Sequence, residues 1–172
     1  VHGMLGQGVL ALAMVLAYLS SPGAQRPPVV LPAVRSVRVL PPIALVALLL
    51  QLFLGASMRH LQVPPTADVG AKIPQWALHG HVTMAIIAFI LVLLAGIRCG
   101  RVTEVPAVRI LGKAVTHTVG LQFLLGIGAL VAVLLRRGEL VPWWEAVATT
   151  AHQTIGALLL ALTAALTVAA RS

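Results

Sequence analysis

The sequence predicts an all-α polytopic membrane protein, and three observations support this fold class. Of the 172 residues, 59% are apolar and only 9% are charged, whereas about a quarter of the residues in an ordinary soluble domain carry a charge. Five stretches approach the roughly 20 apolar residues that a spanning helix needs. None of them shows the period-two alternation of a transmembrane β-barrel. These observations argue against a soluble globule, a disordered chain and a nucleic-acid-binding domain.

Five spans are expected in order along the chain, at residues 1–19, 40–58, 76–97, 108–135 and 143–170. The linkers between them contain residues that end helices, among them Pro28, Pro64, Pro106 and Pro142. No linker is long enough to form a second domain. The lone Cys99 excludes a disulfide framework within the chain.

The net charge of +8 comes from basic residues that are unevenly distributed over the linkers. Most of them follow the first, third and fifth spans, as Arg35, Arg101 and Arg171 do, and fewer follow the second and fourth spans. The positive-inside rule therefore predicts that the first and third linkers and the C-terminus are cytoplasmic. Indole rings prefer the membrane interface, and the outer one is marked by Trp76, Trp143 and Trp144.

Polar residues inside the spans follow a regular pattern. Histidine and glutamine alternate from span to span, and a glycine or alanine follows each of them four residues later, on the same helical face. The five polar residues are His2, Gln51, His81, Gln122 and His152. The interval from Gln51 to Gln122 equals the interval from His81 to His152, so the second and third spans resemble an internal copy of the fourth and fifth.

In an antiparallel bundle of the last four spans, His81 and His152 lie on diagonal helices and face each other at similar depth. Two opposed neutral imidazoles are the axial ligands of a six-coordinate heme iron, whereas zinc prefers three or four protein ligands. A small residue such as Gly156 leaves room for a flat macrocycle. The residues therefore predict an antiparallel four-helix heme-binding bundle, with heme b on His81 and His152, and one preceding transmembrane helix.

Several of these residues also admit a structural role. Gln51 and Gln122 are typical of hydrogen bonding between helices, and small residues four apart are typical of helix packing. His79 is the alternative ligand to His81, which is preferred because the residue four positions after it is smaller. A protein in which these residues only pack would be a transporter or scaffold without heme.

Three residues near the outer ends of the helices each have two interpretations. Arg59 and His60 either anchor the end of the second span in the headgroups or pair with heme propionates. Glu145 is expected to favour the start of the last helix, where the helix dipole stabilises a carboxylate, with proton handling as the alternative.

Five segments resemble the heme A synthase family. They are residues 1–7 (VHGMLGQ), 51–60 (QLFLGASMRH), 78–81 (LHGH), 121–126 (LQFLLG) and 151–156 (AHQTIG). Proteins of that family have eight spanning helices in two pseudo-symmetric four-helix bundles, each with a histidine pair at a heme site. The resemblance covers essentially the whole chain, as the last five helices of eight.

The resemblance implies a division of the chain and a role for each part. Residues 1–20 would be the last helix of an incomplete N-terminal bundle, where His2 is a heme ligand without its partner. Residues 21–39 would be a cytoplasmic linker, and residues 40–172 the complete bundle that holds heme b. The family oxidises the methyl group of heme O to the formyl group of heme A, so heme O and heme A would be substrate and product in the incomplete half.

The resemblance also implies a bacterial cytoplasmic membrane, with heme O synthase, an electron donor and a second copy of the chain as candidate partners in the lipid bilayer. The catalytic acid of the family belongs to the helices that would precede this chain, so we expect the chain alone to be inactive. The loop at residues 61–73 lacks the cysteine pair of some members. The competing hypothesis is a small b-type cytochrome that transfers electrons and modifies no heme.

Overall fold

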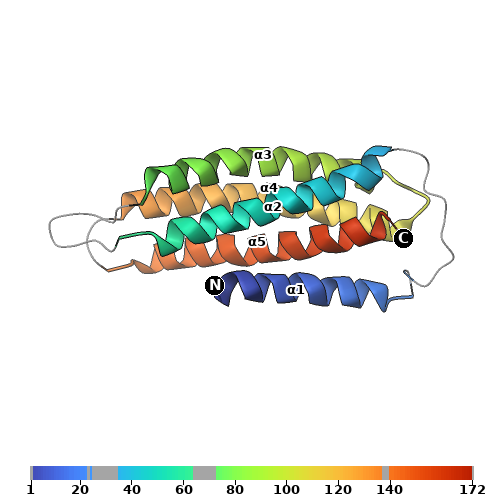
Figure 1. Cartoon of the computed structure of the whole chain (residues 1–172), viewed down its shortest axis with the longest axis horizontal. Helices are drawn as coiled ribbons and strands as arrows, with labels where there is room; N and C mark the ends of the chain where they lie inside the picture. Colours follow the sequence, from blue (N-terminus) through green and yellow to red (C-terminus); the bar gives the residue numbers. More distant parts are fainter. Residues whose placement is uncertain (1, 23, 25–34, 64–72, 137–139, 172) are drawn as a thin grey trace.

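Five α-helices make up the described part of the chain, which in the computed structural model is every residue except 1, 23, 25–34, 64–72, 137–139 and 172. In order they are α1 (His2–Leu19), α2 (Arg35–His60), α3 (Gln75–Gly100), α4 (Pro106–Leu135) and α5 (Trp143–Ala169) (Figure 1). No β-strand occurs among the described residues. The predicted all-α fold class is therefore confirmed.

Four of the helices, α2 to α5, are long and apolar enough to cross a membrane. Large apolar side chains are exposed along them, among them Phe53, Ile87 and Leu124, as expected of a surface that faces lipid. α1 is also apolar, but its span of Gly3–Leu19 is shorter. The predicted spans are thus confirmed for the last four helices and not for the first.

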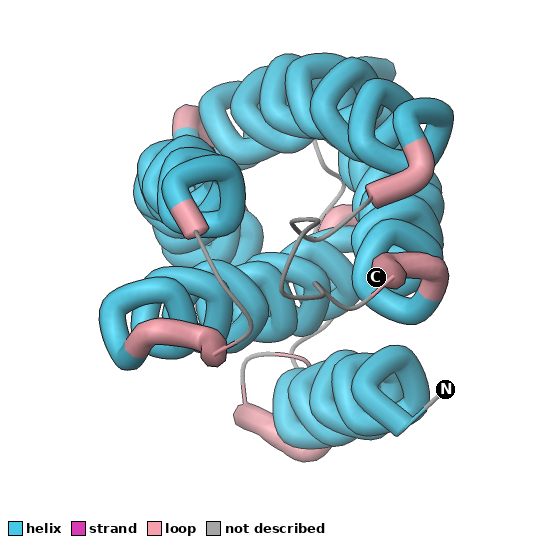
Figure 2. The backbone as a smooth tube through the Cα atoms, turned by 90° about the vertical axis from the view of Figure 1, so that its left-hand side faces the viewer, coloured by secondary structure: helices cyan, strands magenta, loops and turns pink. Residues whose placement is uncertain are grey.

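The helices α2 to α5 form an antiparallel bundle in which each packs against the next and α5 closes the ring against α2 (Figure 2). α1 lies outside this ring and packs along α5. In such a ring α3 and α5 are diagonal and run in the same direction. The arrangement predicted for the last four spans, with one preceding helix, is therefore the observed one.

The start of α2 differs from the prediction. The helix begins at Arg35 rather than at residue 40, so the end of the expected linker at residues 21–39 is helical. Pro41 and Pro42, which the predicted span placed in its first turn, therefore lie in the interior of the helix. A proline signals a helix boundary in sequence because it disrupts the hydrogen bonding of a helix interior, and here the helix continues through two of them.

A contact with α3 explains part of that tolerance. Pro41 has no N–H, so the carbonyl of Val37, four residues earlier, loses its helical partner. The thiol of Cys99 lies against this carbonyl, with its Sγ 3.9 Å from the oxygen. A weak S–H donor thus replaces part of the missing bond, and it joins the start of α2 to the end of α3.

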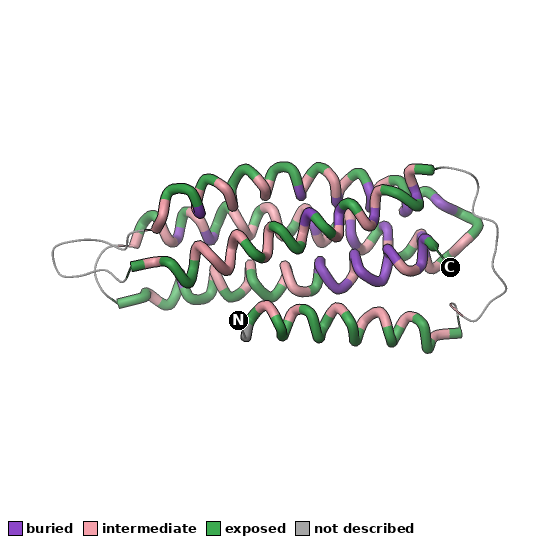
Figure 3. Tube along the Cα trace, in the orientation of Figure 1, coloured by how far each residue is buried: buried purple, intermediate pink, exposed green. Residues whose placement is uncertain are grey.

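Burial divides the bundle into two halves. We call residues 35–47, 88–100, 106–119 and 159–169 the packed half, and residues 48–60, 75–87, 120–135 and 143–158 the histidine half. Most buried side chains belong to the packed half, where Figure 3 shows them in purple near the C-terminus. In the histidine half, the buried residues among those described are Ala77, Ala129, Ala132 and Glu145.

Glycines bring α3 and α4 together in the packed half. A Cβ added to Gly112 would lie 2.7 Å from the carbonyl carbon of Cys99 and closer still to the amide nitrogen of Gly100. A Cβ added to Gly96 would lie 3.0 Å from the carbonyl oxygen of Gly112. Small residues allow such close backbone contact between membrane helices, so this contact fixes the geometry of the packed half.

Candidate functional site

The first candidate pair joins α2 to α3. The amide Nε2 of Gln51 lies 3.1 Å from Nδ1 and 3.2 Å from Nε2 of the half-buried His81. Gly55, one turn after Gln51, lies beneath the same ring, and a Cβ there would be 3.0 Å from Cε1 of His81. Glycine at this position therefore leaves the imidazole the space it occupies.

The second pair repeats this arrangement between α4 and α5. Nε2 of Gln122 lies 3.5 Å from Nε2 of His152, and a Cβ on Gly126 would be 3.0 Å from Cε1 of that ring. In each pair the glutamine precedes the histidine by 30 residues. The internal repeat inferred from the spacing thus has a counterpart in space.

Three of the small residues make room for side chains of the neighbouring helix. The space for a flat macrocycle that was predicted of them stays a prediction. Gly55 and Gly126 accommodate the histidine rings, and a Cβ on Gly156 would lie 2.9 Å from Nε2 of Gln122. They hold each histidine and glutamine in contact, which a single sequence does not reveal because the partner lies on another helix.

The two histidines come from diagonal helices of the bundle. His81 belongs to α3 and His152 to α5. Three polar atoms around them are buried without a hydrogen-bond partner, namely Oε1 of Gln51, Oε1 of Gln122 and Nδ1 of His152. Each such atom costs about 1–3 kcal/mol when it stays unpaired, so the site has spare hydrogen-bonding and ligating capacity.

The donor set of this site favours two protein ligands. Within the part of the chain that the structure describes, no group of three or more His, Cys, Asp and Glu residues could hold a metal ion. A closed zinc site needs such a group. Two imidazoles, of which His152 has a ring nitrogen without a partner, match the two protein ligands of an iron whose remaining four positions belong to a macrocycle, so the residues present fit a heme.

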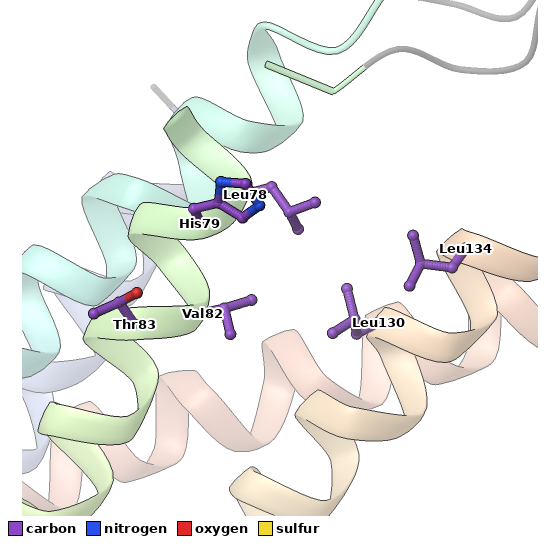
Figure 4. Close-up of a pocket in the computed structure, with 6 residues that line it drawn as sticks. All are labelled: Leu78, His79, Val82, Thr83, Leu130 and Leu134. Carbon is purple, nitrogen blue, oxygen red and sulfur yellow. The ribbon is translucent and has the colours of Figure 1, made fainter. Parts of the chain in front are cut away.

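The structure separates the two candidate ligands of α3. His79 is exposed and lines a groove of about 340 Å³ between α3 and α4, whereas His81 contacts Gln51 of α2. Figure 4 shows this groove with its lining side chains from both helices. They are Leu78, His79, Val82, Thr83, Leu130 and Leu134. The two imidazoles therefore lie on different faces of α3, and His81 is the one that shares a site with Gln51.

Arg59 and His60 do not join this site. Arg59 and His60 are exposed at the end of α2, which is compatible with the anchoring role. The side chain of His2 lies outside the described residues. The backbone beside it is placed, because a Cβ on Gly3 would lie 3.5 Å from Nε2 of Gln153, the residue after His152. α1 therefore starts at the depth of the second pair.

A buried ion pair at the end of the bundle where α5 begins was not predicted. Nη1 of Arg136 lies 3.3 Å from Oε1 of Glu145, and their side chains are only 8% and 7% exposed. Oε2 of Glu145 has no partner. Glu145 therefore joins α4 to α5 in addition to lying in the first turn of α5. The signal in the sequence was a pair of opposite charges on either side of a short connection.

Comparisons with known proteins supply no relative for this arrangement: no family model matches the chain, and neither a curated protein nor a solved structure does. The heme A synthase resemblance therefore remains a prediction from the motifs.

Proposed function

We propose that the bundle of α2 to α5 binds a heme b between His81 and His152, and that the chain is the C-terminal part of a heme A synthase-like membrane oxidoreductase. The observation that carries the heme site is the repeated contact of a histidine with a glutamine and a glycine of the neighbouring helix, with the two histidines on the diagonal helices α3 and α5. The spare ring nitrogen of His152 supports it. The oxidation of the heme O methyl group is proposed from the motif resemblance alone.

The residues of the chain would each perform a physical task. His81 and His152 would hold the iron from opposite sides, and when bound the heme supplies reversible one-electron chemistry. The apolar helices exclude water from the ligands, which strengthens every polar contact between them. Arg59 is exposed and would remain the candidate partner of a heme propionate, because the buried guanidinium of Arg136 is already paired with the carboxylate of Glu145. His2 would contribute to a second site, where the methyl oxidation takes place.

We also propose that the packed half faces the cytoplasm of a bacterial cell. The four apolar helices support an integral membrane protein. The helix ends in the packed half carry Arg35, Arg98 and Arg109, and the positive-inside rule places such an end in the cytoplasm. A reporter enzyme fused after Ser172 tests this orientation, because a reporter that is active only outside the cytoplasm should stay inactive there.

Optical spectroscopy of the purified protein tests the heme site. We expect a Soret band and the sharp bands of low-spin heme b after reduction. His81→Ala and His152→Ala should each remove the bis-histidine spectrum, since each takes away one axial ligand. His79→Ala is the matched control on the same helix and should leave the spectrum unchanged. An unaltered reduced-minus-oxidised spectrum in His81→Ala or His152→Ala would contradict the assignment.

A second assay separates the two redox functions. The protein is produced in a host that makes heme O, and the extracted hemes are identified by mass. Heme A that depends on this protein supports the synthase. The same assay is run on the full-length product of the gene. Bound heme b without any heme A would then identify a small electron-transfer cytochrome instead.

A further inference from the structure

We infer that Gln51 and Gln122 are positioning residues that accept a hydrogen bond from the liganding imidazoles and thereby set the reduction potential of the heme. This inference rests on the proposed heme site. It goes beyond that site because it assigns the glutamines a function other than joining helices.

The contacts of the two amides are specific. Each Nε2 lies against a histidine ring, at 3.1 and 3.2 Å in the first pair and 3.5 Å in the second. Each Oε1 is buried and has no partner. A glutamine that serves only as a link between helices would place both ends of its amide in hydrogen bonds, because an unpaired polar atom is costly in lipid.

The amide can supply either a donor or an acceptor to the same ring. Rotation about its terminal torsion, which has a broad energy profile, exchanges Nε2 and Oε1. As the structure shows it, an amide N–H donates to the ring nitrogen that carries a lone pair. When that lone pair binds iron instead, the other ring nitrogen carries a hydrogen and needs an acceptor. Oε1 of the same glutamine provides that acceptor after half a turn.

The imidazole of His152 has one nitrogen to spare for a metal, whereas both ring nitrogens of His81 contact Gln51. Nδ1 of His152 has no partner, while its Nε2 faces Gln122. For His81, Gln51 lies nearly equidistant from the two ring nitrogens, so either nitrogen can keep the amide while the other is released. Gly55 and Gly126 hold the rings within reach of the amides.

An amide oxygen is an acceptor of intermediate strength for the hydrogen bond from the second ring nitrogen of a metal-bound histidine. Metal-bound histidines usually donate their other N–H to a carboxylate, a carbonyl or water, and this contact raises the basicity of the ligand. A carboxylate is expensive inside a membrane, whereas a neutral amide is a weaker acceptor. The imidazoles are therefore less basic than with a carboxylate partner, and ferric iron is less stabilised relative to ferrous iron.

Potentiometric titration of the purified holoprotein tests this inference, with Gln51→Leu, Gln122→Leu and the matched control Gln153→Leu. Gln153 is exposed on α5 directly after His152, so its replacement makes the same chemical change without touching the ring. We expect Gln51→Leu and Gln122→Leu to keep two histidine ligands but to raise the potential. The expected size is about a tenfold change in the ferric-to-ferrous affinity ratio, or about 59 mV for one electron. Gln153→Leu should leave the potential unchanged.

Gln51→Glu and Gln122→Glu give a second, opposite arm, because a carboxylate strengthens the acceptor and should lower the potential. Low-spin electron paramagnetic resonance then reports the altered ligand field. The inference would be overturned if the leucine variants had the same potential as Gln153→Leu. It would also be overturned if the leucine and glutamate variants shifted the potential in the same direction. If a leucine variant fails to fold, the sign of the shift in the glutamate variant decides. Absence of heme from the unaltered protein would instead overturn the proposed function.

Discussion

Gly112→Ala is expected to destabilise the bundle without touching the candidate site. The new Cβ would lie 2.7 Å from the carbonyl carbon of Cys99, whereas ordinary contact begins at 3.4 Å. α3 and α4 must therefore separate by at least about 0.7 Å, and by more at the amide nitrogen of Gly100, which lies closer still, because backbone atoms cannot rotate away as a side chain can. Two such backbone contacts place the cost of overpacking in the upper part of its usual range, at about 2–3 kcal/mol, and the better helix propensity of alanine returns about 1 kcal/mol.

We therefore expect Gly112→Ala to lose about 1–2 kcal/mol, which lowers the melting temperature by roughly 2–8 °C for a chain of this size. Circular dichroism during heating in one fixed detergent measures the shift. Gly128→Ala on the same helix is the matched control, since no atom lies within 4 Å of a Cβ there. A Gly112→Ala protein as stable as the Gly128→Ala protein would show that α3 and α4 do not approach as the structure describes.

Three further predictions follow from other contacts. Gly126→Ala should displace the ring of His152 by a few tenths of an ångström and weaken heme retention against excess apomyoglobin by up to tenfold, whereas Gly128→Ala should leave retention unchanged. Equal heme retention in the two variants would contradict the contact between Gly126 and the ring of His152. Glu145→Ala should cost about 3–5 kcal/mol in heat denaturation because it leaves the buried Arg136 unpaired, and Arg136→Met combined with Glu145→Leu should recover most of that loss. Cys99, with 0% exposure, should react with a maleimide in detergent much more slowly than in the denatured protein, and equal rates would be inconsistent with its burial.

The sequence predicts the α-helical class and the last four helices well. Long apolar runs have one solution in lipid, because every backbone group must bond within its own segment. α2 starts five residues before the predicted span, and its passage through Pro41 and Pro42 depends partly on a contact with Cys99 that only the tertiary structure provides. The helix predicted at residues 1–19 is observed as α1 at His2–Leu19, so its bounds were predicted closely.

The residues of the candidate site could be predicted from the sequence, but the contacts between them could not. The repeat of histidine and glutamine is visible along the chain, and the structure brings those residues together in pairs. The pairing itself depends on which helix is adjacent to which, and the roles of Gly55 and Gly126 follow only from that adjacency. The ion pair of Arg136 and Glu145 was missed because a charge at a helix end usually indicates interaction with the dipole or with water.

The unequal burial of the two halves has a consequence for the way a large ligand reaches the site. Cooperative units of a protein open locally in order of their own stability, and nearly all buried apolar contacts belong to the packed half. Amide hydrogens of residues 159–169 should therefore exchange with solvent far more slowly than those of residues 143–158. The helix ends around the two histidines can separate briefly while the opposite ends remain joined, so a rigid planar molecule can be loaded or exchanged without global unfolding of the bundle.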